Sequence, residues 1–167
     1  MKFKGIALVA SVLVLGACGG GETTAEAPAA APAAAPAATP AGGAMASGTA
    51  MPITGKMIEI RMVGDAKGYR YEPAIVSAQV GDGLKFLMES GGPHNVAFEA
   101  SMIPAGSAAQ LDANFGTDKI GTMSSGLKMA PGESITISLG GLPAGVYEFN
   151  CTPHLAMNMK GTLTITP

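Results

Sequence analysis

Tryptophan is absent from this chain of 167 residues, and only 5% of the residues are aromatic. Charged residues are also sparse, at 13%, and the formal net charge of −2 leaves no basic excess. Proteins that bind nucleic acids usually carry a basic surface, often with aromatic side chains that stack on bases. The composition therefore excludes nucleic acid as a partner.

The sequence begins with an apolar run that is too short to cross a membrane as a mature helix, which needs about 20 residues. This run, at residues 6–15, follows two lysines and is typical of a secretory signal peptide. The residues Leu15-Gly16-Ala17-Cys18 resemble the lipobox of bacterial lipoproteins. That resemblance implies that residues 1–17 are removed and that a lipidated Cys18 anchors the chain to a membrane facing the periplasm or the cell exterior. The alternative is an ordinary secretory signal with an unmodified Cys18.

Residues 18–55 contain little that could form a core. Alanine dominates this segment, and proline recurs at every fourth position from Pro28 to Pro40. Such a composition favours a disordered chain with extended, polyproline-like stretches. We therefore expect residues 18–55 to be a flexible Ala/Pro/Gly-rich tether and residues 56–167 to form one compact domain.

Cysteine is scarce, because the chain has only Cys18 and Cys151. With Cys18 lipidated, Cys151 is the one free thiol, so the mature domain has no intrachain disulfide although it lies in an oxidising compartment. A lone thiol there is either buried and inert or bound to something. The chain also has only two histidines, His94 and His154, and His154 follows Cys151 by three residues.

Apolar and polar residues alternate through the expected domain with a period of two, which is typical of half-buried β-strands. Clusters of glycine and proline separate these segments and indicate turns. The pattern predicts an all-β fold, an antiparallel β-sandwich with Greek-key connections. Residues 100–129 have no clear period, and we expect a helical turn at 106–111 and a short strand there. The segments expected as strands are 57–63, 75–80, 84–89, 94–98, 135–139, 147–151 and 162–166.

Three side-chain types that bind soft or borderline metals gather in the second half of the chain. They are the thiol of Cys151, the imidazoles of His94 and His154, and the thioethers of Met157 and Met159. A thiolate, two imidazoles and a thioether suit copper in both of its common oxidation states. Each residue also has a purely structural explanation, because single histidines, cysteines and methionines are common in protein cores. Zinc is a further alternative, although its tetrahedral sites seldom use a thioether.

Two separated segments carry a resemblance to a known family. Tyr147-Glu148-Phe149-Asn150-Cys151-Thr152-Pro153-His154, followed by Met159, and Pro93-His94-Asn95-Val96 upstream resemble the small blue copper proteins, the cupredoxins. Within these the similarity is to the plastocyanin, amicyanin and pseudoazurin group. It extends over residues 57–167 and implies a cupredoxin-like fold.

The resemblance implies one copper ion held by three equatorial ligands and one axial methionine. Members of the family use both of the spacings at which Met157 and Met159 follow His154. Met159 is preferred because the axial methionine of the family stands two residues before the glycine that opens the last strand, as Met159 stands before Gly161. The implied equatorial ligands are His94, Cys151 and His154.

Asn95, next to His94, resembles an asparagine of the family that hydrogen-bonds across to the cysteine-bearing loop, here near Thr152. Such a contact would lock the two ligand segments together. The alternative is an asparagine that favours a turn and has no special role.

The resemblance implies a monomeric, membrane-tethered carrier of one electron that docks transiently with extracytoplasmic redox proteins. It is not expected to be an enzyme, because a four-ligand site has no open position for substrate. By the same resemblance the imidazole edge of His154 reaches the surface in an apolar patch and is the exit for the electron.

Two other functions stay open at this point. A copper carrier or chaperone that delivers the ion to another protein would be supported by exposed methionines. A copper-free interaction domain is a third alternative, against which the intact set of donor residues argues. The methionines that bear on copper delivery are Met102, Met123, Met129 and Met157.

Overall fold

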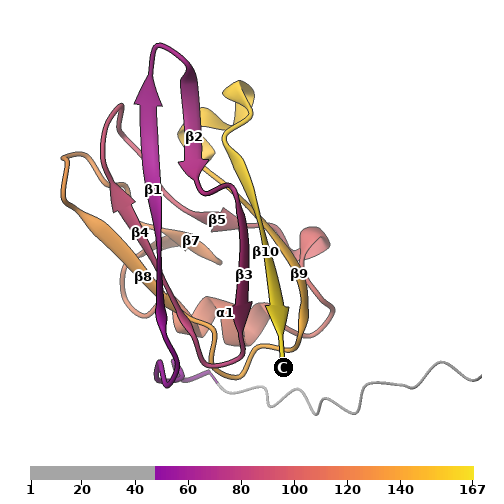
Figure 1. The fold of residues 1–167 in the computed structure, drawn as a ribbon. Helices are drawn as coiled ribbons and strands as arrows, with labels where there is room; N and C mark the ends of the chain where they lie inside the picture. The colour runs from indigo at the N-terminus through magenta and orange to yellow at the C-terminus, as the bar shows by residue number, and fades with distance from the viewer. Residues whose placement is uncertain (1–47) are drawn as a thin grey trace, which may run out of the picture. The chain divides into compact units, whose positions relative to one another are not determined.

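The computed structural model describes residues 48–167, and most of the elements in this part of the chain are β-strands. They form two sheets that enclose one hydrophobic core, so the predicted β-sandwich is confirmed (Figure 1). The predicted signal peptide, Cys18 and most of the predicted tether lie outside the described residues. The first sheet contains, in spatial order, β2 (Gly68–Glu72), β1 (Met57–Asp65), β4 (Gly83–Met88) and β8 (Ser134–Ser138).

The second sheet is built around the last two strands of the chain, which form a hairpin. β3 is one edge strand of this sheet, and the short strands β5, β7 and β6 lie towards the other edge. In spatial order it contains β3 (Ile75–Gln79), β10 (Lys160–Thr166), β9 (Gly145–Asn150), β5 (Ala97–Phe98), β7 (Ser124–Ser125) and β6 (Lys119–Gly121).

Both sheets are mixed, whereas the alternation of residues suggested wholly antiparallel pairing. β1 pairs with β4 in parallel, and β10 pairs with β3 in parallel. The reason is topological: after the β1–β2 hairpin the chain crosses to the other sheet as β3, and it returns as β4 in the direction of β1. Alternation reports which face of a strand is buried, and it does not report the direction of the neighbouring strand.

Aromatic side chains from the two sheets meet in the core. Phe149 on β9 contacts Tyr71 on β2 edge-to-face, with ring centroids 4.8 Å apart, and Phe86 on β4 with centroids 5.3 Å apart. Edge-to-face contacts of this kind stabilise a core beyond the area that they bury. They also fix the end of β9, the strand that leads directly into Cys151.

The segment 100–129, which had no clear period, contains a 3-10 turn, η1 (Ala100–Met102), and one helix, α1 (Ala108–Asn114). The expected helical turn at 106–111 therefore begins two residues later and extends further than predicted. The short strand expected in this segment is also present, as the pair β6 and β7.

The described chain enters the domain far from its last loop. The backbone N–H of Met51 donates to Asn114 Oδ1 at 2.9 Å, and Gln110 Nε2 donates to the Thr49 carbonyl at 3.1 Å. Contacts with the domain thus begin before the boundary expected at residue 56. This entry lies beside the C-terminus in Figure 1, whereas the 3-10 segment η2 (Thr152–Met157) lies at the opposite end.

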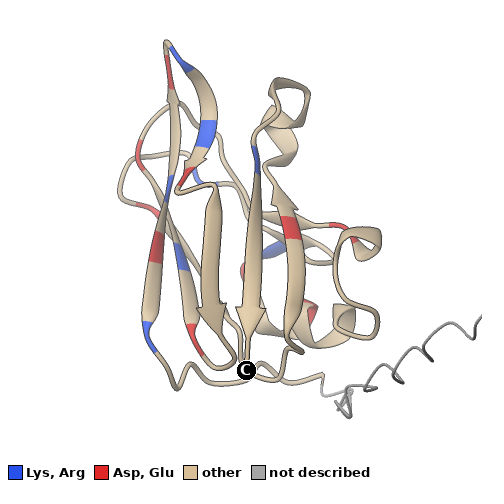
Figure 2. Ribbon diagram, turned by 45° about the vertical axis from the view of Figure 1, so that its right-hand side comes forward, with Lys and Arg blue, Asp and Glu red and all other residues tan. Residues whose placement is uncertain are grey.

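Several charged residues lie together on the β1–β2 hairpin, whereas those on the other strands are isolated (Figure 2). The loop at residues 151–159 contains no lysine, arginine, aspartate or glutamate. Within residues 48–167, no helix combines the length and the apolar character needed to span a lipid bilayer.

Candidate metal centre

The β9–β10 hairpin positions three of the predicted site residues. Cys151 directly follows β9, His154 lies in η2, and Met159 directly precedes β10. Two backbone hydrogen bonds close the loop: Cys151 N–H donates to the Met159 carbonyl at 3.0 Å, and Met159 N–H donates to the His154 carbonyl at 3.2 Å. The loop between the strands is therefore held by its own backbone.

His94 reaches the same place from the connection between β4 and β5. Its backbone pairs with Lys128 in an isolated antiparallel bridge, in which His94 N–H donates at 3.0 Å and Lys128 N–H donates back at 2.7 Å. A short backbone ladder thus fixes a residue that lies outside the regular strands.

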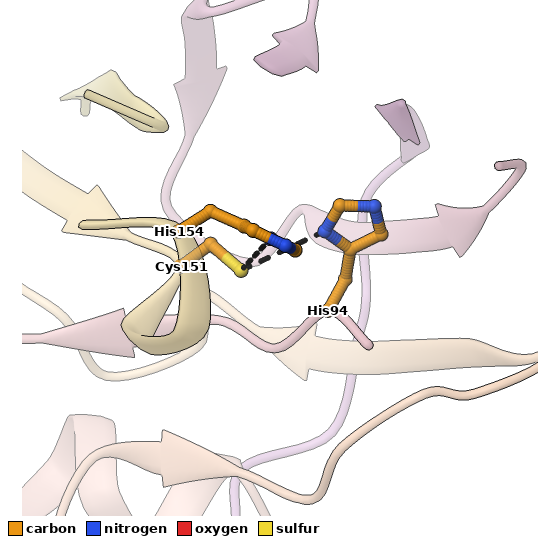
Figure 3. Close-up of side chains that lie close together, drawn as sticks. All are labelled: His94, Cys151 and His154. Atoms are coloured by element: carbon orange, nitrogen blue, oxygen red, sulfur yellow. Dashed lines mark hydrogen bonds between the residues drawn. The ribbon is translucent and has the colours of Figure 1, made fainter. Parts of the chain in front are cut away.

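The side chains of Cys151, His94 and His154 converge (Figure 3). Cys151 Sγ lies 3.6 Å from His94 Nδ1 and 3.4 Å from His154 Nδ1. One donor atom from each residue can be chosen so that all three lie within 4.8 Å of one another, and all three residues are buried. The structure therefore brings together the three residues that the sequence predicted as equatorial ligands.

Hydrogen bonding and burial both prepare His94 to donate a lone pair from Nδ1. Nε2–H donates to the Ser90 carbonyl at 2.8 Å, which leaves Nδ1 of the neutral ring unprotonated and facing the sulfur. Burial lowers the pKa of His94, although the Ser90 contact acts in the opposite direction. Burial also lowers the pKa of His154, and the neighbouring His94 adds to this effect. Both imidazoles are thus favoured in the neutral form that binds metals.

Burial raises the pKa of the Cys151 thiol, and the backbone N–H groups of Asn95 and His154 oppose this shift. Only the thiolate is a strong metal ligand. A metal ion that binds here must therefore displace the thiol proton, and binding is coupled to proton release.

Asn95 joins the two segments that carry these side chains. It is fully buried, and its Oδ1 accepts from the Thr152 N–H at 2.8 Å. Its Nδ2 donates to Thr152 Oγ1 at 3.3 Å and to Ser124 Oγ at 3.2 Å. The contact expected between Asn95 and the neighbourhood of Thr152 is therefore present.

The two candidate methionines differ in exposure. Met159 is fully buried, in the same core cluster as Cys151, whereas 54% of Met157 is exposed. His154 retains 5% exposure. The imidazole edge that the sequence analysis expected at the surface is therefore small.

Two residues at this site were not predicted from the sequence. Ser90 acts through its backbone carbonyl, which no side-chain motif reveals. Tyr69 stacks on His154, with ring centroids 3.7 Å apart. It lies on β2, about 85 positions earlier in the chain, so no local spacing could have connected the two residues.

The donor set fits a copper ion. Two ligands of one metal ion, each at about 2.0 to 2.3 Å, cannot lie more than about 4.6 Å apart. The two sulfur–nitrogen separations, 3.4 and 3.6 Å, satisfy this limit. A buried thiolate with two imidazoles is also the chemistry that copper prefers in proteins that exchange one electron.

Comparison with known proteins agrees with this geometry. The profile described as "Copper binding proteins, plastocyanin/azurin family" matches residues 58–166, which is more than half of the chain. The chain belongs to this family. Copper is thus its cofactor. Proteins of this family are electron carriers and not enzymes, so the expectation that the chain is not an enzyme is confirmed.

Individual relatives are similar over most of the described domain. A plastocyanin of Prochlorothrix hollandica is 35% identical over 117 residues, which cover 70% of this chain and 79% of that protein. A plastocyanin of Solanum crispum is 34% identical over 108 residues, which cover 65% of this chain and 99% of that protein. Among solved structures, oxidised plastocyanin from Dryopteris crassirhizoma is 27% identical, with a TM-score of 0.48, and covers 65% of this chain and 100% of that one.

Proposed function

We propose that this chain is a blue, type 1 copper protein that carries one electron at a time between extracytoplasmic redox partners. The observation that carries this proposal is the convergence of Cys151 Sγ with the Nδ1 atoms of His94 and His154 at a buried point. Bound copper would supply the chemistry by cycling between Cu(II) and Cu(I). The residues of the chain hold, orient and shield it.

In this proposal His94, Cys151 and His154 are the equatorial ligands and Met159 is the axial ligand. The burial of Met159 and its backbone hydrogen bonds to both Cys151 and His154 support this choice over the exposed Met157. The thioether is the weak fourth ligand that this type of site uses. The buried set leaves no position for a substrate, which suits transfer of an electron alone.

The surface next to His154 supports transient docking. Within η2, Leu155 is 40% exposed and Met157 is 54% exposed. No charged side chain lies in the loop that carries them. A small apolar surface of this kind suits a partner that binds weakly and leaves quickly. We propose that the electron leaves through His154 at this surface and passes to the docked redox partner. We also propose that the protein is a monomer.

The beginning of the sequence supports an extracytoplasmic location. The apolar run at residues 6–15 and the lipobox-like residues before Cys18 suggest export followed by lipidation. Cys18 would then hold the protein on a membrane, and the residues between Cys18 and the first contacts with the domain, at Thr49 and Met51, would be the tether.

Copper delivery, the alternative function, is supported by fewer exposed methionines than the sequence suggested. Met102, Met129 and Met157 are exposed, but Met123 is only 5% exposed and packs in the core. Met123 therefore cannot contribute to the exposed apolar surface or to a thioether cluster there, which corrects the sequence-based expectation.

The proposal is tested by the visible and electron paramagnetic resonance spectra of the Cu(II)-loaded protein, with Cys151→Ser and the exposed Met157→Leu as a matched pair. An intense thiolate-to-copper absorption with small hyperfine splitting is expected in the unaltered protein and in Met157→Leu. Cys151→Ser should abolish it. A weak, ordinary Cu(II) spectrum that survives Cys151→Ser would overturn the proposal.

A further inference from the structure

One aromatic ring lies directly on the proposed metal centre. The ring of Tyr69 is stacked on the imidazole of His154, with centroids 3.7 Å apart and planes 11° apart. The same ring contacts His94 edge-on, with centroids 6.1 Å apart. Tyr69 is therefore in contact with both proposed imidazole ligands.

The two imidazoles are held in different ways. Nε2 of His94 is fixed by the Ser90 carbonyl at 2.8 Å. Within residues 48–167, no protein group hydrogen-bonds to Nε2 of His154. Imidazole ligands usually need a second contact that fixes the orientation of the ring. For His154, the stacked ring of Tyr69 takes the place of such a hydrogen bond.

The β1–β2 hairpin is shaped to hold Tyr69 there. Tyr69 lies opposite Gly64 in the strand register. A Cβ atom at Gly64 would lie 2.7 Å from the Tyr69 ring and 2.9 Å from Gly91 Cα. Both distances are shorter than van der Waals contact, so only glycine leaves room for the ring in this position.

The same hairpin is connected to His94 through a shared carbonyl. The Ser90 carbonyl accepts a hydrogen bond from Gly64 N–H at 2.8 Å and another from His94 Nε2 at 2.8 Å. The position of the hairpin and the orientation of His94 therefore depend on the same backbone atom.

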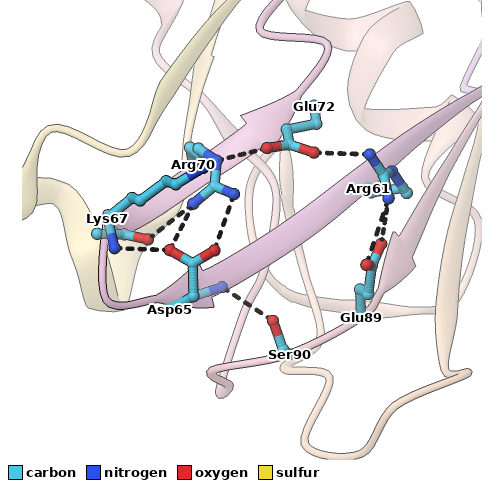
Figure 4. Close-up of polar contacts among 9 residues, drawn as sticks. Arg61, Asp65, Lys67, Arg70, Glu72, Glu89 and Ser90 are labelled. Carbon is cyan, nitrogen blue, oxygen red and sulfur yellow. Dashed lines mark hydrogen bonds and ion pairs between the residues drawn. The ribbon is translucent and has the colours of Figure 1, made fainter.

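A network of ion pairs braces the hairpin (Figure 4). Arg70, next to Tyr69, pairs with Asp65 across the turn at 2.9 Å and also contacts Glu72. Arg61 on β1 pairs with Glu72 at 2.7 Å and with Glu89 at 3.1 Å. The network ties β2 to β1 and to the end of β4, which restrains the backbone that carries Tyr69.

We propose that Tyr69 is a positioning residue of the metal centre, whose stacked ring holds the His154 imidazole in its metal-binding orientation. The inference rests on the proposed function. The ring, rather than the hydroxyl group, performs this role, because the stack is formed by the aromatic faces.

The test compares Tyr69→Leu with Tyr69→Phe in the copper-loaded full-length chain. We measure the rate at which a Cu(I) chelator, bathocuproine disulfonate, removes copper from the reduced protein, and the resonance spectrum of the Cu(II) form. Tyr69→Leu should release copper about two- to tenfold faster, the factor that corresponds to the strength of one aromatic pair. It should also change the Cu(II) hyperfine splitting. Tyr69→Phe should match the unaltered protein in both measurements.

A control separates positioning from general stability. Tyr147→Phe alters a buried tyrosine on β9 whose hydroxyl donates to the Pro143 carbonyl and whose ring stacks on neither His94 nor His154 in the described residues, so it should leave copper release and the spectrum unchanged. Gly64→Ala keeps the Tyr69 ring but crowds it, and it should act in the same direction as Tyr69→Leu.

The inference is overturned if folded Tyr69→Leu releases copper at the unaltered rate with an unaltered spectrum. It is also overturned if Tyr69→Phe behaves like Tyr69→Leu, because the hydroxyl group would then be responsible. Either result overturns the inference alone when the unaltered protein shows the intense thiolate-to-copper absorption. Its absence from the unaltered protein would instead be a failure of the proposed function.

Discussion

Asn95 connects the segment that carries His94 to the loop that carries Cys151 and His154. Its Oδ1 is the acceptor for the Thr152 N–H, and its side chain is fully buried. Asn95→Ala leaves that N–H without its acceptor and removes two further hydrogen bonds. We predict that the free energy of unfolding of the metal-free protein falls by about 1 to 3 kcal/mol, measured by urea denaturation.

Ser124→Ala is the matched control for Asn95→Ala. It removes one acceptor of Asn95 Nδ2, which keeps Thr152 Oγ1 as a partner. The loss of stability should therefore be clearly smaller. Equal stability of Asn95→Ala and the unaltered protein would show that the two segments are held together by other contacts.

The two methionines of the loop give a second prediction at the residue scale. Met159→Leu nearly conserves the volume of a fully buried side chain, so the fold should be kept. If Met159 is the axial ligand, as we propose, this substitution leaves a lower-coordinate site, which favours Cu(I), and the reduction potential should rise. Met157→Leu should leave the potential unchanged. Voltammetry of both copper-loaded variants checks this, and a shift seen only in Met157→Leu would exchange the two assignments.

Among the elements, the β9–β10 hairpin depends on a close approach at Gly161. Gly161 on β10 pairs with Phe149 on β9, and a Cβ atom there would overlap the Phe149 ring and lie 3.0 Å from the Ala74 carbonyl oxygen. Gly161→Ala should destabilise the protein by about 1 to 3 kcal/mol, as overpacking does. Gly121→Ala is the control, since its Cβ would meet only Ser124 Cβ at 3.8 Å. Equal melting temperatures for the two variants would contradict this account.

The turn between β8 and β9 gives a prediction about pH. Tyr147 is buried, its hydroxyl donates to the Pro143 carbonyl at 2.8 Å, and burial raises the pKa of Tyr147 to about 12. The unfolded chain loses this proton near pH 10, about two units earlier. Between about pH 10 and 12 the folded state thus binds more protons than the unfolded state, and its stability falls as the pH rises.

Tyr147→Phe removes both the hydrogen bond and this titration. It should be less stable than the unaltered protein by about 1 kcal/mol at pH 8. The difference should shrink above about pH 10, because only the unaltered protein then loses the tyrosine contribution. Urea denaturation of the metal-free proteins at pH 8 and pH 11 measures both values. A difference that stays constant across this range would contradict the raised pKa.

Most strands were predictable because one face of each is buried. β10, for example, buries Gly161, Leu163 and Ile165 in strict alternation. β2 was not predicted, since among its five residues only Tyr71 is fully buried and the others are half-exposed. Its place depends on pairing with β1, which the local pattern does not encode.

The donor residues of the site were predictable for a different reason. Cys151 and His154 lie three positions apart in one loop, so their spacing is local, and His94 is one of only two histidines. The contacts of Tyr69 and of the Ser90 carbonyl depend on long-range pairing of the β1–β2 hairpin. Spacing along the chain therefore could not reveal them.

In the molecule as a whole, the proposed metal centre and the chain entry lie at opposite ends of the domain (Figure 1). Met51 is hydrogen-bonded to α1 at one end, and Cys151 follows β9 at the other. A tether that begins at the entry would leave the apolar surface around Leu155 and Met157 free for docking. This arrangement suits a carrier that must present one end to its partners.

The most direct test of the account is repeated oxidation and reduction of the copper-loaded protein in the presence of a Cu(I) chelator, with the bound copper determined after each cycle. An electron carrier keeps its ion, so we predict a reversible one-electron wave and a constant copper content through many cycles. Loss of copper to the chelator in the first reductions, with disappearance of the wave, would contradict electron transfer and favour delivery of the ion.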